Sequence, residues 1–197
     1  MSRPTQGRAL LVLGLAVLAV AGGGAPSMAG TASEEAIYRA LLENRAAATT
    51  GDRVLLVGSR ATLRSPFGTM DRRQFRALLA DAGAPSDLLE KTNQVSGSTP
   101  GPRSGTLQRG QRRVDSGEIE RIFDDAPSPE VGWSRLYERY PTASGFLHFS
   151  PVVFSDDGDR AGVVETFVCG VDCGDTRILL LEEGIEGWVV MAEVRVP

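Results

Sequence analysis

The C-terminal stretch of the chain, residues 146–196, carries the pattern that most restricts the possible folds. β-prone segments alternate there with short turns, which are rich in glycine and acidic residues and lie at 156–159 and 184–187. The expected strands cover residues 146–154, 161–168, 176–182 and 188–196. Turns this short connect neighbouring strands that run in opposite directions. The stretch therefore predicts an antiparallel β-meander of about four strands.

The last expected strand shows the clearest alternation of side chains. Its two alternating sets are Trp188, Val190, Ala192, Val194 and Val196, and Val189, Met191, Glu193 and Arg195. Side chains two residues apart lie on the same face of a strand. We therefore expect each set to lie on one face of the sheet.

Upstream of the meander, apolar residues recur at helical spacing behind residues that typically start helices. The expected starts are the capping-box pair Thr31 and Glu34, then Asp71, Ser86, Asp115 or Ser116, and Ser128 followed by Pro129. Residues 54–57 are interpreted as a buried strand. The helices need an apolar surface, and the meander supplies one. We predict an α+β fold, with helices packed on the meander and residues 30–197 forming a single domain.

Residues 95–113 interrupt this pattern with a high content of glycine, serine and proline. Such a composition predicts a long flexible loop. Its cationic residues are Arg103, Arg109, Arg112 and Arg113. They are interpreted either as solvated arginines or as a weak contact for an anionic surface, such as lipid headgroups or a polyanion. The first interpretation is favoured, because no aromatic side chain is interleaved with them.

The first 29 residues have the parts of a secretory signal peptide. Arg3 and Arg8 lie in a polar start, residues 9–21 are apolar or small, and small residues precede the bond between Ala29 and Gly30. The apolar run is shorter than the roughly 20 residues that cross a bilayer. We therefore expect cleavage after Ala29, export to the periplasm or the exterior, and no stable membrane insertion of the cleaved protein. An uncleaved anchor is the alternative.

The charge balance and the glycine pattern exclude several functions. The chain has a net charge of −4, and loss of Arg3 and Arg8 with the signal peptide would make it −6. Binding to nucleic acid rests largely on cations that neutralise phosphates, so we expect no nucleic-acid partner. The sequence has no phosphate-binding glycine loop and no dinucleotide fingerprint, and we expect no cofactor.

Cys169 and Cys173 are the two cysteines of the chain, and they flank a three-residue turn between two expected strands. Exported proteins fold in oxidising surroundings, so we expect a disulfide that clips this hairpin. For so short a loop its stabilisation is about 2 kcal/mol. Thiol redox chemistry is an alternative, although the spacing is C-x3-C rather than C-x2-C. No metal site is expected, since zinc would need two more ligands and His148 is the sole histidine.

Two groups of side chains suggest catalysis. His148 and Ser150 would share one face of a strand, but no nucleophile elbow accompanies them. Glu165, Glu182 and Glu183 supply carboxylates for a hydrolase, which would require the fold to bring two of them together.

A further acidic group, made of Asp156, Asp157 and Asp159, offers oxygen ligands of the kind that calcium prefers. The further ligands of an EF-hand loop are absent from the sequence that follows. Asp-Gly is good turn chemistry, so we expect these residues to form a turn.

A series of short signatures runs through residues 133–190. They are Trp133, Tyr140-Pro141, Gly145, LHFSPVVFSDDGDRA, CGVDCG, LLLE and GWVV. In this series, over about a third of its length, the chain resembles an uncharacterised family of bacterial exported proteins and lipoproteins. It departs from the family at Asp175, where a glycine is expected, and at its end, EVRVP, which lacks a terminal Trp-x-Ser. The resemblance implies export and a β-meander, and it implies no activity because none is known for the family.

These observations favour an exported, non-enzymatic binding or interaction domain with an unknown partner. The alternatives are a secreted carboxylate-dependent hydrolase and a thiol redox protein built on Cys169 and Cys173. A concave pocket that holds Glu165 or Glu182 with a raised pKa would favour the hydrolase. A closed sheet face would favour the binding domain.

Overall fold

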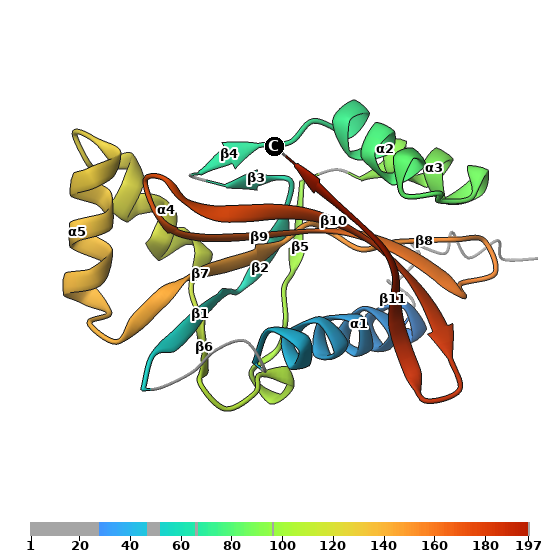
Figure 1. The fold of residues 1–197 in the computed structure, drawn as a ribbon, viewed down its shortest axis with the longest axis horizontal. Helices are drawn as coiled ribbons and strands as arrows, with labels where there is room; N and C mark the ends of the chain where they lie inside the picture. Colours follow the sequence, from blue (N-terminus) through green and yellow to red (C-terminus); the bar gives the residue numbers. More distant parts are fainter. Residues whose placement is uncertain (1–27, 47–51, 66, 96, 197) are drawn as a thin grey trace, which may run out of the picture.

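A mixed β-sheet with helices on both faces organises the protein in the computed structural model, which describes residues 28–46, 52–65, 67–95 and 97–196 (Figure 1). The strands of this sheet are β1 (Val54–Gly58), β6 (Gln111–Val114), β7 (Ala143–Phe149), β8 (Val153–Phe154), β9 (Arg160–Gly170), β10 (Cys173–Gly184) and β11 (Gly187–Val196). Within the described ranges they follow the order β11-β10-β9-β7-β1-β6, and β8 pairs with β9. Two small antiparallel sheets accompany it, made of β2 (Arg60–Thr62) with β5 (Ser98–Pro100) and β3 (Arg64–Ser65) with β4 (Gly68–Thr69).

The helices cover the two faces of the sheet in separate groups. They are α1 (Met28–Ala46), α2 (Arg72–Asp81), α3 (Ser86–Lys91), α4 (Ser116–Asp124) and α5 (Pro129–Arg139), with short 3-10 turns at Thr92–Gln94 and Ser104–Thr106. α1 packs on one face, which we call the α1 face. On the opposite face, α4 and α5 pack near β1 and β7, while α2 and α3 pack on β9, β10 and β11. The predicted α+β fold is confirmed.

The meander is correct, but it is only part of a larger sheet than the four strands expected. β7, β9, β10 and β11 pair in antiparallel order, whereas β1 pairs in parallel with both β6 and β7. Parallel neighbours are joined by long crossovers, so no short turn in the sequence marks their pairing. None of the helices in the described part of the chain combines the length and the apolar character needed to cross a membrane.

The expectation of a loop over the whole of residues 95–113 is wrong, because the segment contains β5, a 3-10 turn and most of β6. Its backbone is bound to other strands: Gly101 N donates to Ser59 O at 2.9 Å, and β6 pairs with β1. A Cβ atom at Gly101 would lie 2.9 Å from Gly58 O, so the close approach of the two backbones requires glycine. Backbone hydrogen bonds need no apolar side chains, so the composition gave no sign of this pairing.

Most of the expected helix boundaries are confirmed. Asp71 forms a capping box with Gln74 at the start of α2, and Gly83 follows that helix with a φ of +84°. Asp115 caps α4 by accepting from Gly117 N at 3.1 Å. Ser128 is the N-cap residue of α5, and Pro129 follows at its first position.

Two expected starts are wrong by a few residues. α1 begins at Met28 rather than after Thr31, so Ala29 and Gly30 lie in its first turn. Ser86 lies inside α3, because Pro85 holds the extended conformation of the preceding cap position. Capping patterns show where a helix can start, but helix contacts elsewhere in the fold can extend it by a turn.

The strict alternation expected for β11 is broken at Met191. Leu180 is opposite Ala192 and Leu181 is opposite Val190, so Met191 is an extra residue in a β-bulge. A one-residue insertion reverses the face on which every later side chain lies. Trp188 therefore packs on the α1 face. The later residues Ala192, Val194 and Val196 pack against α2 and α3 on the opposite face.

Candidate functional site

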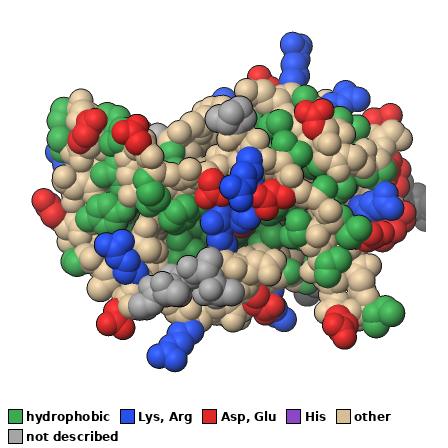
Figure 2. Space-filling view, in the orientation of Figure 1, with side chains coloured by type: hydrophobic (Ala, Val, Ile, Leu, Met, Phe, Trp, Pro, Cys, Tyr) green, Lys and Arg blue, Asp and Glu red, His purple; other side chains and the backbone are tan. Residues whose placement is uncertain are grey.

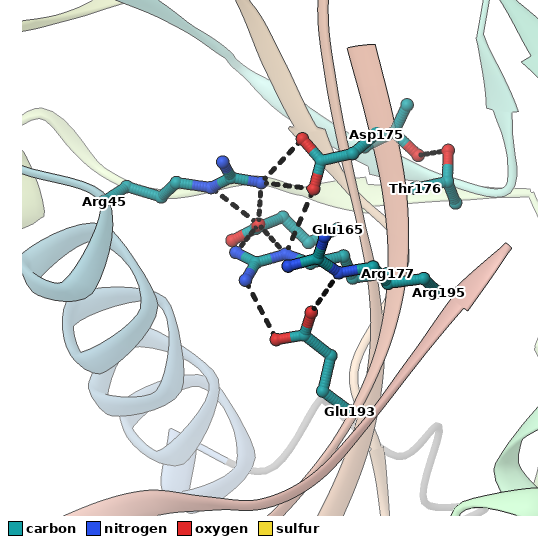
Figure 3. Close-up of polar contacts among 8 residues, drawn as sticks. Arg45, Glu165, Asp175, Thr176, Arg177, Glu193 and Arg195 are labelled. Atoms are coloured by element: carbon teal, nitrogen blue, oxygen red, sulfur yellow. Dashed lines mark hydrogen bonds and ion pairs between the residues drawn. The ribbon is translucent and has the colours of Figure 1, made fainter. Parts of the chain in front are cut away.

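A charged cluster lies on the α1 face at the end of α1 (Figure 3). Its members are Arg45 from α1, Glu165 from β9, Asp175 and Arg177 from β10, and Glu193 and Arg195 from β11. Glu165 is fully buried, and its Oε1 accepts hydrogen bonds from Arg45 Nε at 2.8 Å and from Arg177 Nε at 3.1 Å. In Figure 2, acidic and basic side chains are gathered over these strands at the centre of the visible face.

The cluster neutralises itself and fastens α1 to the sheet. Arg45 Nη2 also lies 3.0 Å from Asp175 Oδ2, and Arg177 Nη1 lies 3.0 Å from Glu193 Oε2. Arg195 Nε lies 3.0 Å from Glu193 Oε1, so three arginines meet three carboxylates. In the described part of the chain, Oε2 of Glu165 is buried without a hydrogen-bond partner. The geometry points to a structural ion-pair network.

Glu165 and Glu182, two of the carboxylates proposed for a hydrolase, are not brought together. Glu165 is opposite Arg177 in the β9–β10 pairing, whereas Glu182 is opposite Arg160 at the other end of the ladder. Five residues along a strand span about 17 Å, which exceeds the roughly 5–10 Å between the carboxyl groups of glycosidases. Glu182 instead lies 3.6 Å from Arg160 as a half-exposed ion pair.

The opposite face of the same strands holds a cavity around the sole histidine. His148 on β7 is directly opposite Thr166 on β9, which is opposite Thr176 on β10, which is opposite Val196 on β11. Directly opposite residues share a face, so these four side chains form one row across four strands. The row is the floor of the cavity, and the β3–β4 hairpin with Phe67 at its turn lies over it.

We call this space the His148 cavity, and its volume is about 190 Å³. Besides His148, its polar lining consists of Thr62, Ser65, Thr69, Gln74, Thr166 and Thr176. Its apolar lining consists of Leu63, Phe67, Met70, Val164 and Val196, with Gly68 beside them. Among the described residues, no acidic or basic side chain apart from the imidazole lines it.

The imidazole of His148 is buried without its hydrogen bonds satisfied. Only 7% of the residue is exposed, and neither Nδ1 nor Nε2 has a hydrogen-bond partner in the described part of the chain. Burial lowers the pKa of His148 to about 4, and a contact with the backbone of Phe149, too long or too bent for a regular hydrogen bond, offsets only part of that effect. The ring is therefore neutral at ordinary pH, with one N–H donor and one nitrogen acceptor. Buried polar groups without partners are rare, and each one calls for an explanation.

A wider groove of about 760 Å³ adjoins the His148 cavity. The two share Phe67, Thr166, Thr176 and Val196. The turn between α4 and α5 forms one wall of the groove, and the β9–β10 hairpin forms the other. Phe67 stands between the groove and the cavity, where it packs on Phe123, Trp133 and Phe146.

The two cysteines form a disulfide pair in the β9–β10 hairpin, with their Cα atoms 5.0 Å apart. Cys173 lines the groove, and the hydroxyl of Tyr137 donates to Cys169 O at 2.7 Å. Redox chemistry gains no support from this placement, since the pair closes a hairpin turn and Cys173 does not lie at a helix N-terminus.

Ser150 does not form a catalytic pair with His148. β7 ends at Phe149, and the hydroxyl of Ser150 accepts from Val164 N and donates to Pro151 O, both at 2.9 Å. It therefore bonds to the backbone of β9 and to that of the β7–β8 connection, and the imidazole lies in the separate row described above.

The acidic residues of the 156–159 segment form the predicted turn. Asp156 lies 2.6 Å from Lys91, and Ser155 Oγ donates to Asp159 Oδ1 at 3.2 Å. Side-chain hydrogen bonds to Ser155 and Asp159 lower the pKa of Asp157, and its hydrogen bond to Asp159 raises the pKa of the latter. No group of three potential ligands that could hold a metal ion occurs among the residues that the structure describes.

Three arginines of the 95–113 segment contact the protein itself. Arg103 Nε lies 3.9 Å from Glu35 Oε2, and the guanidinium of Arg112 lies 5.3 Å from the centre of the Tyr140 ring. Arg113 Nε donates to Pro102 O at 2.9 Å. Three of the four arginines therefore have contacts within the protein itself. An anionic surface as partner, which would also involve Arg109, stays a prediction.

The comparisons with known proteins give no relative from which the role of these sites could be inferred. No protein-family model, no curated protein and no solved structure matches the chain. The resemblance to a family of exported bacterial proteins therefore stays a prediction.

Proposed function

We propose that the protein is an exported, non-enzymatic binding domain that holds a small molecule in the His148 cavity. One observation carries this proposal: a buried imidazole, whose two nitrogens have no hydrogen-bond partner among the described residues, borders a cavity that also presents hydroxyl groups. Concave sites with an apolar lining and a few convergent polar groups are the usual form of small-molecule sites. A ligand would supply the hydrogen bonds that the protein does not.

The chemistry of the lining favours binding over catalysis. An imidazole with a pKa of about 4 is a weak base at neutral pH, and general bases work best with a pKa near the operating pH. Among the described residues, no carboxylate or thiol lines the cavity to serve as a second catalytic group. The Glu165 carboxylate that a hydrolase would need is held by two arginines on the other face.

Export is part of the proposal. The sequence of residues 1–29 has the order of parts of a signal peptide, and residues 1–27 lie outside the described part of the chain. The Cys169–Cys173 pair supports an oxidising compartment, since disulfides persist there. The intact mass of the protein exported by its host, before and after reduction, tests both features. A start at Gly30 with two hydrogens missing would agree with the proposal.

The binding function can be tested through the imidazole itself. Because the chain has one histidine, protein labelled with ¹⁵N-histidine and made without a polyhistidine tag gives one pair of ring nitrogen signals. We expect some members of a library of small organic molecules to shift these signals and, at saturation, to raise the Tm by about 3 °C or more.

A cavity-filling variant is the matched control. Val196 is half-buried at the end of β11, so Val196→Phe occupies part of the space at an adaptable position. The same molecules should then lose their effect on the His148 signals. A library in which no molecule shifts the signals of the wild-type protein would contradict the proposed function.

A further inference from the structure

We infer that the occupant of the His148 cavity is a small uncharged molecule, with a hydrogen-bond donor and an acceptor at one polar end and an apolar remainder. This inference rests on the proposed function and specifies the ligand class of the same site. It follows from the hydrogen-bonding groups, the charges and the size of the cavity.

The polar end of the ligand is defined by the row on the cavity floor. The neutral imidazole of His148 offers one donor and one acceptor, neither of which is used within the described part of the chain. Thr166 and Thr176 lie beside it in register, and their hydroxyl oxygens are 3.2 Å apart. One of these hydroxyls donates to the other, which leaves one hydrogen for a further acceptor. A group that both donates and accepts, such as a primary amide, matches this floor.

The charge of the ligand is restricted by the surroundings of the cavity. The charged neighbours of the floor residues along the strands, Glu165, Asp175 and Arg177, belong to the network on the α1 face. Burying an ion without a partner of opposite charge carries a large desolvation cost. Among the described residues, the adjoining groove is lined by Asp172 and Asp175 and by no basic side chain, so it adds no cation for an anionic ligand. A neutral molecule avoids the desolvation cost that an anion or a cation would have in the cavity.

The volume and the apolar lining define the rest of the ligand. A cavity of 150 Å³ can hold benzene, and the His148 cavity is somewhat larger at about 190 Å³. Leu63, Phe67 and Met70 line it from the segment over the floor, and Val164 and Val196 line it from the sheet. A molecule of roughly 7 to 10 non-hydrogen atoms with one apolar end therefore fits.

Four probes of similar size separate these properties. Benzamide is neutral with a donor and an acceptor, benzoate is an anion, benzamidinium is a cation, and toluene has no polar group. Each is titrated at pH 7 into ¹⁵N-histidine-labelled protein, and the His148 ring signals and calorimetric heats are followed. We expect a dissociation constant for benzamide of about 1 mM or below. The other three should bind at least about tenfold more weakly.

Two variants test whether the polar floor carries the selectivity. His148→Phe keeps a planar ring and removes both nitrogens, so benzamide should bind about tenfold more weakly while toluene binds as well or better. Thr166→Val keeps the size of the side chain and should weaken benzamide by a few-fold. Glu182→Gln, at the distant end of β10, serves as a control and should leave all four affinities unchanged.

The results separate a wrong ligand class from a wrong function. Tighter binding of benzoate, benzamidinium or toluene than of benzamide, with a shift of the His148 signals, would overturn the inference and leave the binding function intact. Benzamide binding that is unchanged in His148→Phe would overturn it as well. If benzamide has no effect but another library molecule shifts the His148 signals, the ligand class is wrong. If no molecule shifts them, both proposals fail.

Discussion

Glu165 and Thr166 are neighbours on β9, yet their side chains lie on opposite faces of the sheet in two unlike surroundings. On the α1 face, Glu165 meets Arg45 and Arg177 in an ion-pair network. On the other face, Thr166 lies between His148 and Thr176 at the floor of a cavity. One face pairs its charges, and on the other the uncharged imidazole has no hydrogen-bond partner among the described residues.

The difference separates a feature of stability from the feature on which the proposed function rests. The arginines around Glu165 compensate the cost of burying its charge. The unsatisfied imidazole of His148 has no such compensation, and a buried polar group left without a partner costs about 1–3 kcal/mol. An apolar side chain would suit a sheet face selected only for stability. The cost at His148 is understandable if a ligand makes the missing hydrogen bonds.

Removal of the Glu165 carboxylate is expected to have the largest effect on stability. In Glu165→Leu, Arg45 and Arg177 lose the acceptor that they share, while both remain mostly buried. Breaking a buried ion pair by removing one partner costs about 3–5 kcal/mol. We expect the free energy of unfolding, measured by urea titration, to fall by about 4 kcal/mol.

Two variants control for this prediction. Glu165→Gln keeps a hydrogen-bond acceptor and should lose roughly half as much. Glu182→Gln affects a half-exposed pair with Arg160 and should change the stability by less than about 1 kcal/mol. A Glu165→Leu protein as stable as the wild type would show that the network does not hold α1 on the sheet.

The next largest effect on stability is expected when the pH is lowered, because of the buried His148. Its pKa is about 4 in the folded protein and 6.5 in a model peptide, so between these values the unfolded chain binds a proton that the folded protein does not. The free energy of unfolding therefore decreases as the pH falls from about 6.5 to about 4, by roughly 3 kcal/mol from this residue. Above pH 6.5 the residue contributes no pH dependence.

His148→Phe isolates this contribution from that of the carboxylates. The difference in unfolding free energy between wild type and variant, measured by urea titration at several pH values, should grow by roughly 3 kcal/mol in favour of the variant from pH 7 to pH 4. At pH 7 the variant should be as stable as the wild type or more so, since an apolar ring needs no hydrogen bond. Equal pH dependence in both proteins would contradict a buried neutral imidazole.

Reduction of the hairpin is expected to have the smallest effect of the three. A disulfide that closes a five-residue loop contributes about 2 kcal/mol or less, and the pair lies beyond the cavity floor, which begins at Thr176. Reduction should therefore lower the unfolding free energy by at most that amount and leave the His148 ring signals in place. The double variant Cys169→Ser, Cys173→Ser should show no further response to reductant. Loss of the His148 signals on reduction would show that the hairpin maintains the cavity.

Local features were predictable from the sequence where a few neighbouring residues decide them. The cap at Asp71, the helix start at Ser128 and Pro129 and the turn at 156–159 all involve hydrogen bonds or backbone preferences within a few positions. The same local reasoning could not find the parallel pairing of β1 with β6, because no short turn marks it.

Local sequence patterns also could not reveal the candidate site, because the site depends on pairing between strands that are distant in sequence. The sequence placed His148 beside Ser150 on one face of a strand and offered Glu165 as a possible catalytic carboxylate. The structure places His148 at a cavity and Glu165 in an ion-pair network. The sequence does show that His148, Thr166 and Thr176 lie on three different β-prone segments. Whether their side chains meet depends on the register between those segments.

Short-range sequence thus determines the helices, the turns and the hairpin of Cys169 and Cys173, because the bonds that define them join residues a few positions apart. The surroundings of Glu165 and His148 are decided by tertiary structure. Glu165 meets Arg45 across 120 positions of sequence, and the row of His148 depends on the pairing of β7 with β9. A shift of one residue in a strand would move its side chains to the other face. Register, which long-range packing sets, therefore decides which side chain is paired and which one borders the cavity.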